Sequence, residues 1–452
     1  MRVATLLRRS ALQGLIPLFA SLIAGCSGGG EVTVLKFWAM GREAEVVRAL
    51  VPEFESRHPG VKVEVQQLPV TSAHEKLLTA FAGDSTPDVC QLGNTWIAEL
   101  TTLGALDPLD ERVAASKVVD RADYFESIWA TNVVDGRTWG VPWYVDTRLL
   151  FYRKDILARA GYDHPPQNWT EWHEMMLAIK RVVGPENFAV LAPLNEFEPL
   201  QILALQQPEE MLRDGGRYGN FRSESFRKAL SFYTSLFEEK LAPPFTNTQI
   251  SNVWLELGRG YYSFYISGPW NIGEFKRRLR ADQQDTWMTA SMPGPEGPGV
   301  STAGGSSLVV FQRSRNKALA WELIEFLSHP AQQQRLHELT GDLPPRRSTW
   351  QTPQLANDVY SKAFRAQLER LRPVPQVPEW ERIMEEMKLM AERVSRGAET
   401  PDQGVTRLDA RVDRMLEKRR WMLAQREEQR AAATRAPDAR AVASNGSRGQ
   451  GS

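Results

Sequence analysis

The pattern of apolar and polar residues predicts a strand–helix–strand–helix–strand order at the start of the folded chain. Three short segments have strand patterns: 32–38 (VTVLKFW), 61–65 (VKVEV) and 87–92 (PDVCQL). Apolar residues recur at helical spacing after Glu43 and again over residues 73–82. This order predicts a parallel sheet covered by helices, with ligands at the carboxyl ends of its strands. Those ends fall at Trp38–Glu43 and Gly93–Trp96.

The rest of the chain shows the same two kinds of pattern. Further strands are predicted at 188–191, 261–266 and 308–311, and helices at 169–180, 226–240, 317–327, 380–394 and 405–423. The Pro- and Gly-rich segment 292–299 reads as a loop. From residue 424 to residue 452 no apolar period survives, so we expect a disordered tail.

Residues 138–155, TWGVPWYVDTRLLFYRKD, combine several aromatic residues with two charged residues, Asp146 and Arg148. Asp146 and Arg148 follow Tyr144 at strand spacing, so both point to one side of a strand. Indole faces stack on the C–H faces of sugars, and carboxylate and guanidinium groups pair with sugar hydroxyls. The alternative is an ordinary core in which Asp146 and Arg148 only pair with each other.

Composition narrows the classes of partner. Lys plus Arg and Asp plus Glu both number 55, giving a formal net charge of zero, which argues against nucleic acid as a partner. Fourteen tryptophans need either core space or a ligand, and glycan binding is one use for them. Cys26 and Cys90 are the two cysteines, and Cys90 is expected to be a buried thiol.

The N-terminus has the features of an export signal. Residues 1–25 contain Arg2, Arg8 and Arg9 and then a short apolar stretch. The stretch ends in Leu-Ile-Ala-Gly before Cys26, which resembles the lipobox of bacterial lipoproteins. We therefore expect a lipoprotein signal peptide over 1–25, acylation of Cys26 and a flexible tether over 26–30. A plain secretory signal with an incidental cysteine is the alternative.

Short motifs in a fixed order resemble the extracellular solute-binding proteins of ATP-binding-cassette (ABC) importers, in the carbohydrate-binding branch typified by maltose-binding proteins. They are the lipobox, KFWAMGREAE, FESRHPGVKV, TPDVCQL, WYVDTRLLFYRKD, NWTEW, ISGPWN and GDLPPRR. Together they cover about residues 31–423. Each motif is weak alone, and their order and spacing carry the resemblance.

The resemblance implies an α/β fold of two lobes, a ligand cleft between them and a hinge of several crossing strands. Carried over, the crossings lie near 149–153, 302–308 and 328–334. Lobe 1 then consists of residues 31–147 and 306–333, and lobe 2 of residues 148–305 and 334–423.

The resemblance also implies a set of ligand-binding residues: Glu43, Asn94, Thr95, Trp96, Tyr144, Asp146, Trp270, Asn271, Arg346 and Trp380, with Asn195 and Glu196 as softer candidates. The alternative for Glu43 is a structural role, in which its negative charge interacts favourably with the dipole at a helix N-terminus. Trp270 follows a strand and a proline, which favours stacking over core packing, whereas Trp380 also opens an amphipathic helix. At Arg42 and Thr95, maltose-binding proteins have carboxylates, so maltodextrin specificity does not follow.

The resulting expectation is a lipid-anchored, extracytoplasmic monomer that captures a sugar and delivers it to the transmembrane subunits of an importer. Neither a cofactor nor a metal is expected. Two other classes remain: a ligand sensor that docks on a membrane receptor, and an exported glycan-active enzyme. Asp146 and Glu43 offer a carboxylate pair for the latter, but the sequence contains no G-x-S-x-G, H-E-x-x-H or phosphate-binding motif.

Overall fold

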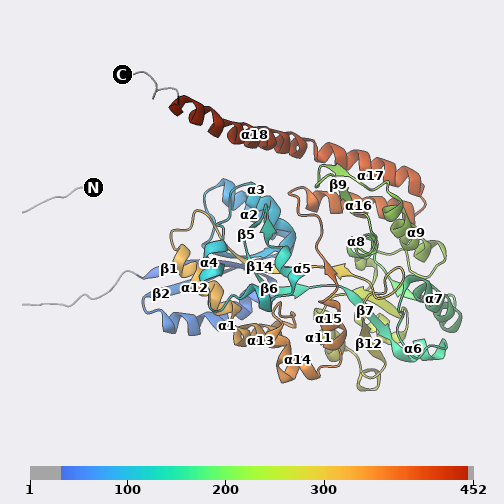
Figure 1. Ribbon diagram of the computed structural model, residues 1–452. Helices are drawn as coiled ribbons and strands as arrows, with labels where there is room; N and C mark the ends of the chain where they lie inside the picture. Colours follow the sequence, from blue (N-terminus) through green and yellow to red (C-terminus); the bar gives the residue numbers. More distant parts are fainter. Residues whose placement is uncertain (1–31, 446–452) are drawn as a thin grey trace, which may run out of the picture.

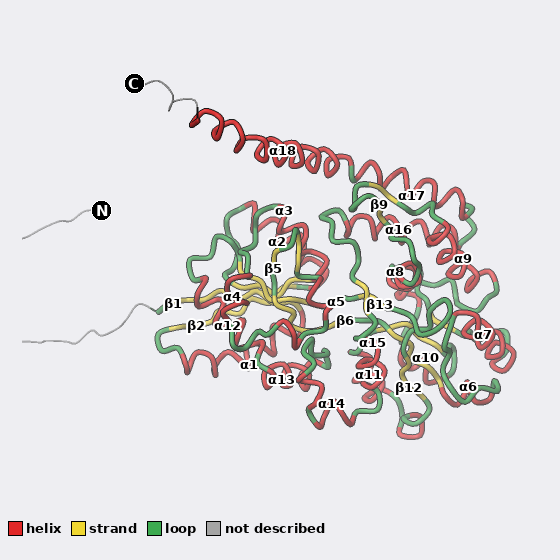
Figure 2. Tube along the Cα trace, viewed as in Figure 1, coloured by secondary structure: helices red, strands yellow, loops and turns green. Residues whose placement is uncertain are grey.

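The computed structural model describes residues 32–445, with side chains through residue 432, and it contains two lobes side by side (Figure 1, Figure 2). The predicted signal peptide 1–25, the acylated Cys26 and the tether 26–30 lie outside these residues. The family's two-lobe α/β fold, predicted from the sequence, is confirmed. Each lobe has its own sheet and its own apolar core.

Lobe 1 is built on a five-stranded sheet in the order β2-β1-β3-β14-β6. The strands are β1 (Thr33–Met40), β2 (Val61–Leu68), β3 (Val89–Gly93), β6 (Val141–Asp146) and β14 (Gly304–Val310). β1 runs parallel to β2 and β3, whereas β14 is antiparallel to β3 and β6. The helices of this lobe are α1 (Gly41–Arg57), α2 (Ala73–Ala82), α3 (Ile97–Thr102), α4 (Asp110–Ala115), α5 (Glu126–Ala130), α12 (Lys317–Ser328) and α13 (Pro330–Thr340). The parallel start of the sheet therefore agrees with the sequence pattern.

Lobe 2 is built on a four-stranded sheet in the order β12-β7-β11-β8. The strands are β7 (Leu149–Arg153), β8 (Val190–Leu191), β11 (Phe264–Ser267) and β12 (Trp287–Ala290). Its longer helices are α7 (Trp169–Val183), α8 (Glu198–Leu205), α9 (Glu224–Glu238), α11 (Trp270–Arg278), α16 (Trp380–Ser395) and α17 (Pro401–Met415). Shorter elements are α6 (Lys154–Arg159), α10 (Val253–Arg259), α14 (Pro353–Asn357), α15 (Ser361–Gln367), β9 (Leu212–Arg213) and β10 (Tyr218–Gly219).

Two passages between the lobes are short. Only Thr147 and Arg148 separate β6 in lobe 1 from β7 in lobe 2. The second passage runs through β13 (Ser301–Thr302), which pairs with β15 (Leu371–Arg372), into β14. A hydrogen bond from Ser301 Oγ to the Arg148 carbonyl, 2.6 Å long, ties the two passages together.

The third passage differs from the prediction of 328–334. In the structure α13 covers this segment and packs on α1 and α12, so it still belongs to lobe 1. Leu336 is buried in the lobe 1 core. Continued helical packing explains the difference, because Pro330 opens a new helix on the same body instead of ending the lobe.

The tail is also different from the prediction. Residues 417–445 form one helix, α18 (Glu417–Asn445), where we expected disorder from 424. Its first turns lie on the β9–β10 hairpin: Arg420 donates to the Arg217 carbonyl and Arg217 pairs with Glu427. The neighbouring residue Arg426 has its Nη1 3.5 Å from Asp135 of lobe 1. This segment has no apolar stripe, so apolar periodicity did not predict a helix there. It is rich in Ala and Arg, which have high helix propensity.

Across residues 32–445, no helix has the length and apolarity needed to cross a membrane. Cys90 is fully buried, as predicted, and burial raises the pKa of its thiol.

Candidate functional site

The first part of the site is a cavity of about 180 Å³ between the lobes. Lobe 1 contributes the loop after β3, and lobe 2 contributes the start of α8 and the start of α16. The residues that line it include Asn94, Thr95, Trp96, Asp146, Arg148, Glu198 and Glu381. Four residues of the predicted ligand set, Asn94, Thr95, Trp96 and Asp146, therefore lie together.

The side-chain amide of Asn94 has a hydrogen-bond partner at its oxygen but none at its nitrogen. Its Oδ1 accepts a hydrogen bond of 2.9 Å from Ser307 Oγ, and the residue is only 3% exposed. Its Nδ2 is buried and has no partner among the described atoms. A buried amide N–H without a partner is costly, so this donor is well suited to a ligand acceptor.

Glycines allow β14 to come close to β6 beside this cavity. Gly305 has φ +127°, and a Cβ at this position would lie 2.2 Å from the Tyr144 carbonyl oxygen. A side chain there would push the strands apart. The close approach lets Ser306 Oγ reach Tyr144 Oη at 3.0 Å, and Gln91 Nε2 donates to the same Tyr144 Oη at 3.0 Å.

Arg148 is the cation at the centre of the site. Its guanidinium pairs with Asp146 and, at 2.6 Å, with Glu198. Burial raises the pKa of the Asp146 carboxyl, and the neighbouring Arg148 partly offsets that effect. The pairing of Asp146 with Arg148, which the core alternative expected, is thus present, and both residues also line the cavity.

A second cavity of about 590 Å³ continues the site beyond Arg148. Glu43, Trp270 and Asp342 are among its lining residues. The Arg148 guanidinium carbon lies 4.5 Å from the centroid of the Trp270 ring, so a lining residue of each cavity is in contact at this pair. Trp270 is 37% exposed, which agrees with the prediction of an exposed ring.

Glu43 and Asp342 both line this second cavity, and Tyr144 on β6 interacts electrostatically with both carboxyl groups. Burial and the neighbouring Glu43 carboxylate raise the pKa of Asp342 well above its usual range. Burial also raises the pKa of the Tyr144 phenol, with Asp342 and Glu43 adding to the effect. These groups form an acceptor-rich wall at the end of β6 and the start of α1.

Three predicted site residues have other surroundings. Trp380 is 1% exposed and packs in the lobe 2 core, because α16 is amphipathic and Trp380 falls on its apolar face. Arg346 donates to Asp123 at 2.6 Å and to the Ser328 carbonyl at 2.8 Å, and lines neither cavity. Asn271 is 2% exposed and bonded to Ser267 and Trp254. For these three the sequence prediction was wrong in placing the side chain in the cleft.

The softer candidates lie at the edge of the site. Asn195 and Glu196 both bond to Asn247 in the loop after α9. Burial and the nearby Glu198 raise the pKa of Glu196 to about 7.

Sequence reasoning missed several residues of the site: Gln91, Glu198, Asp342 and Glu381. Gln91 had a usable signal, because it is a polar residue inside a fully buried strand. Asp342 lies in the GDLPPRR motif, from which Arg346 was chosen instead. Glu198 and Glu381 have no sequence signal, since each is one acidic residue in the first turn of a helix.

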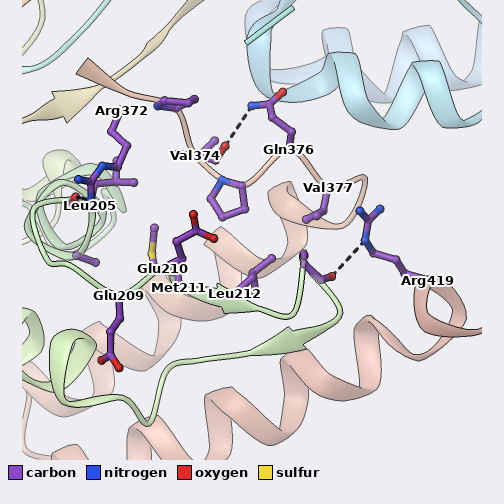
Figure 3. A pocket seen from close by; sticks show the side chains of 15 residues that line it. Leu205, Glu209, Glu210, Met211, Leu212, Arg372, Val374, Gln376, Val377 and Arg419 are labelled. Atoms are coloured by element: carbon purple, nitrogen blue, oxygen red, sulfur yellow. Dashed lines mark hydrogen bonds between the residues drawn. The ribbon is translucent and has the colours of Figure 1, made fainter. Parts of the chain in front are cut away.

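A separate cavity of about 430 Å³ lies inside lobe 2 (Figure 3). Arg372 lies at one end and Arg419 at the other, and each donates to backbone carbonyls. Val374 lines both this cavity and the smaller interlobe cavity. The described residues contain no group of three or more acidic, His or Cys side chains arranged for a metal.

Comparisons with known proteins agree with this architecture. The chain is 56% identical to the sugar-binding protein MalE from Xanthomonas citri, with a TM-score of 0.85, covering 87% of this chain and all of that one. It is 24% identical to a galactooligosaccharide-binding protein of Bacillus subtilis over 86% of this chain and 90% of the relative. An uncharacterized lipoprotein of Streptomyces antibioticus is 33% identical over 39% of this chain and 40% of its own length.

The family model described as bacterial extracellular solute-binding protein matches residues 41–334. This match covers more than half of the chain and includes four of the five strands of the lobe 1 sheet, the whole lobe 2 sheet and the two short passages between the lobes. The chain therefore belongs to the family of bacterial extracellular solute-binding proteins.

Proposed function

We propose that this protein captures a sugar in the interlobe cleft and delivers it to the transmembrane subunits of an ABC importer. The observation that carries the proposal is the combination, between the lobes, of an exposed indole, several partly buried carboxylates and the unpartnered amide of Asn94. Family membership supports the transport role.

The chemistry of the cleft suits a polyhydroxylated ring. Glu43 and Asp146 offer acceptors for sugar hydroxyls, Asn94 offers a donor, and the Trp270 ring offers a flat apolar surface. Tyr144 supports the cleft from the β6 side. The similarity to proteins named for sugar or galacto-oligosaccharide binding favours a mono-, di- or oligosaccharide.

The two lobes supply the mechanism. Two short passages join them, so a few backbone torsions are enough to bring the walls together. Ligand favours closure only if it binds the closed form better than the open one. Asn94 on lobe 1 and Trp270 on lobe 2 meet one ligand only in the closed form, whose shape a permease can then recognise.

We further propose that the protein is exported, anchored through an acyl group on Cys26 and active as a monomer. The basic start, the apolar stretch and the lipobox-like LIAGC support the anchor. We also propose that the sugar is released unchanged, because the named relatives are binding proteins.

A thermal-shift screen of the purified protein against neutral mono- and disaccharides and short oligosaccharides tests the function. A true ligand raises the melting temperature in proportion to its excess over Kd. Calorimetry on the positive sugars then gives a Kd, and chromatography of the recovered sugar checks that it is intact. Absence of any sugar-dependent shift or heat would contradict the proposal.

A further inference from the structure

Glu381 makes a hydrogen bond that joins the two lobes inside the cleft. It lies in the first turn of α16 in lobe 2, and its carboxylate accepts a hydrogen bond from the hydroxyl of Thr95. Thr95 lies directly after β3 of lobe 1. Both residues line the smaller interlobe cavity, together with Asp146 and Arg148. The bond is therefore part of the wall of the ligand site.

The lobe 2 end of this contact is fixed by the core. Trp380, Ile383 and Met384 on α16 are all buried, with exposures of 1%, 0% and 3%. Helix packing of this kind sets the position of the first turn, so Glu381 cannot follow lobe 1 when the lobes separate. Trp380, which the sequence analysis had proposed as a ligand-binding residue, thus packs in the lobe 2 core and fixes the position of Glu381 beside it.

The lobe 1 end is fixed as well. The Trp96 ring lies 3.3 Å from where a Cβ would stand on Gly93, and its centroid is 5.0 Å from that of His74. His74 Nε2 in turn lies 2.6 Å from Glu99 on α3. These contacts hold the turn that carries Thr95 against the body of lobe 1.

Because both ends are rigidly attached to different lobes, the Thr95–Glu381 bond exists only in the closed form. Both partners belong to the protein, so the bond stabilises closure with or without a sugar. We infer that Glu381 is a positioning residue that acts as an interlobe latch and sets ligand affinity through the population of the closed form. An apparent Kd is the intrinsic Kd divided by the fraction of molecules that are competent to bind, so a weaker latch weakens binding without removing a sugar contact.

Only the statement that the latch sets sugar affinity rests on the proposed function. The latch also predicts a property of the ligand-free protein, namely that loss of the bond opens the cleft. The experiment therefore uses Thr95→Val, which removes the donor, Glu381→Ala, which removes the acceptor, and the double variant. Glu385→Ala is the matched control, because Glu385 is an exposed residue one turn farther along α16 that pairs with Lys388.

Small-angle scattering of the ligand-free proteins is the first measurement. Thr95→Val and Glu381→Ala should show a larger radius of gyration than wild type, with the melting temperature kept, whereas Glu385→Ala should not. If the radii of both latch variants equal that of wild type, the latch is refuted, and this holds even if no sugar is found to bind.

Stopped-flow or surface-based kinetics with a sugar from the thermal-shift screen is the second measurement. Each single variant should weaken affinity by on the order of tenfold, through faster dissociation, since a hydrogen bond to a charged group has about this effect. The double variant should lose no more than the weaker-binding single variant, because both changes remove one bond. Additive losses would mean that Thr95 and Glu381 contact the sugar independently, and would overturn the inference.

Discussion

The Arg148 guanidinium lies on the ring of Trp270, with its central carbon 4.5 Å from the ring centroid. Arg148 comes from the passage between β6 and β7, and Trp270 opens α11 of lobe 2. Gly268 makes this arrangement possible, since a Cβ there would lie 1.9 Å from the Trp270 ring. The passage between β6 and β7 and the exposed Trp270 ring are therefore in direct contact.

Replacing Trp270 with Ala should weaken sugar binding by about ten- to a hundredfold, because a stacked ring contributes on the order of 1–3 kcal/mol. Calorimetric titration with the identified sugar is the measurement. Trp421→Ala is the control, since Trp421 is 65% exposed on α18 and lies outside both interlobe cavities. Equal affinity of a folded Trp270→Ala variant and wild type would remove Trp270 from the binding site.

Replacing Arg148 with Met should lower the free energy of unfolding by on the order of 3 kcal/mol. The change leaves Asp146 and Glu198 in the cleft without their cation, and Arg148 itself is only 14% exposed. Urea denaturation measures the loss. Arg313→Met should cost under about 1 kcal/mol, because its pair with Asp84 is half-exposed or more. A similar small loss for both variants would contradict the central position assigned to Arg148.

Glu196 should make the protein less stable as the pH rises. Burial and Glu198 raise the pKa of Glu196 from 4.5 to about 7, so the folded form keeps a proton that the unfolded chain has already released. Between these two pH values the folded state binds more protons, and the free energy of unfolding falls with rising pH.

Glu196→Gln should therefore be more stable than wild type at neutral and higher pH, by up to about 3 kcal/mol, and about equal to it below pH 4.5. Denaturation of both proteins across this pH range is the measurement. Glu210→Gln, at an exposed position, controls for general charge effects. A stability difference that is independent of pH would show that Glu196 has the same pKa in the folded and unfolded states, and would contradict the prediction.

Cys26 should carry the lipid anchor. Wild type expressed in a bacterial host should incorporate a fatty-acid probe and partition into the detergent phase, whereas Cys26→Ala should do neither. Cys90→Ala is the matched control, because Cys90 is buried within lobe 1 and is not available for acylation. Equal labelling of wild type and Cys26→Ala would refute the lipoprotein assignment.

The sequence alone determined the elements and the family. Periodic apolar positions predicted β1, α1, β2, α2 and β3 to within a few residues, since these elements bury one face and the pattern records which face it is. The order of short motifs predicted the two-lobe fold, and six of the ten residues it proposed as ligand-binding line the two interlobe cavities. Spacing alone placed Asp146 and Arg148 on one side of a single strand; in the structure Asp146 ends β6 and Arg148 lies in the passage before β7, and the two form an ion pair.

Only the tertiary structure decided which polar and aromatic side chains share a space. Trp270 and Trp380 were both candidates for stacking on a sugar, but Gly268 and Arg148 hold the first at the cleft while the apolar stripe of α16 buries the second. Glu381, next to Trp380 in sequence, meets Thr95 only because the two lobes close on each other. Such contacts between residues 286 positions apart depend on how two rigid bodies are placed, and no local periodicity encodes that placement.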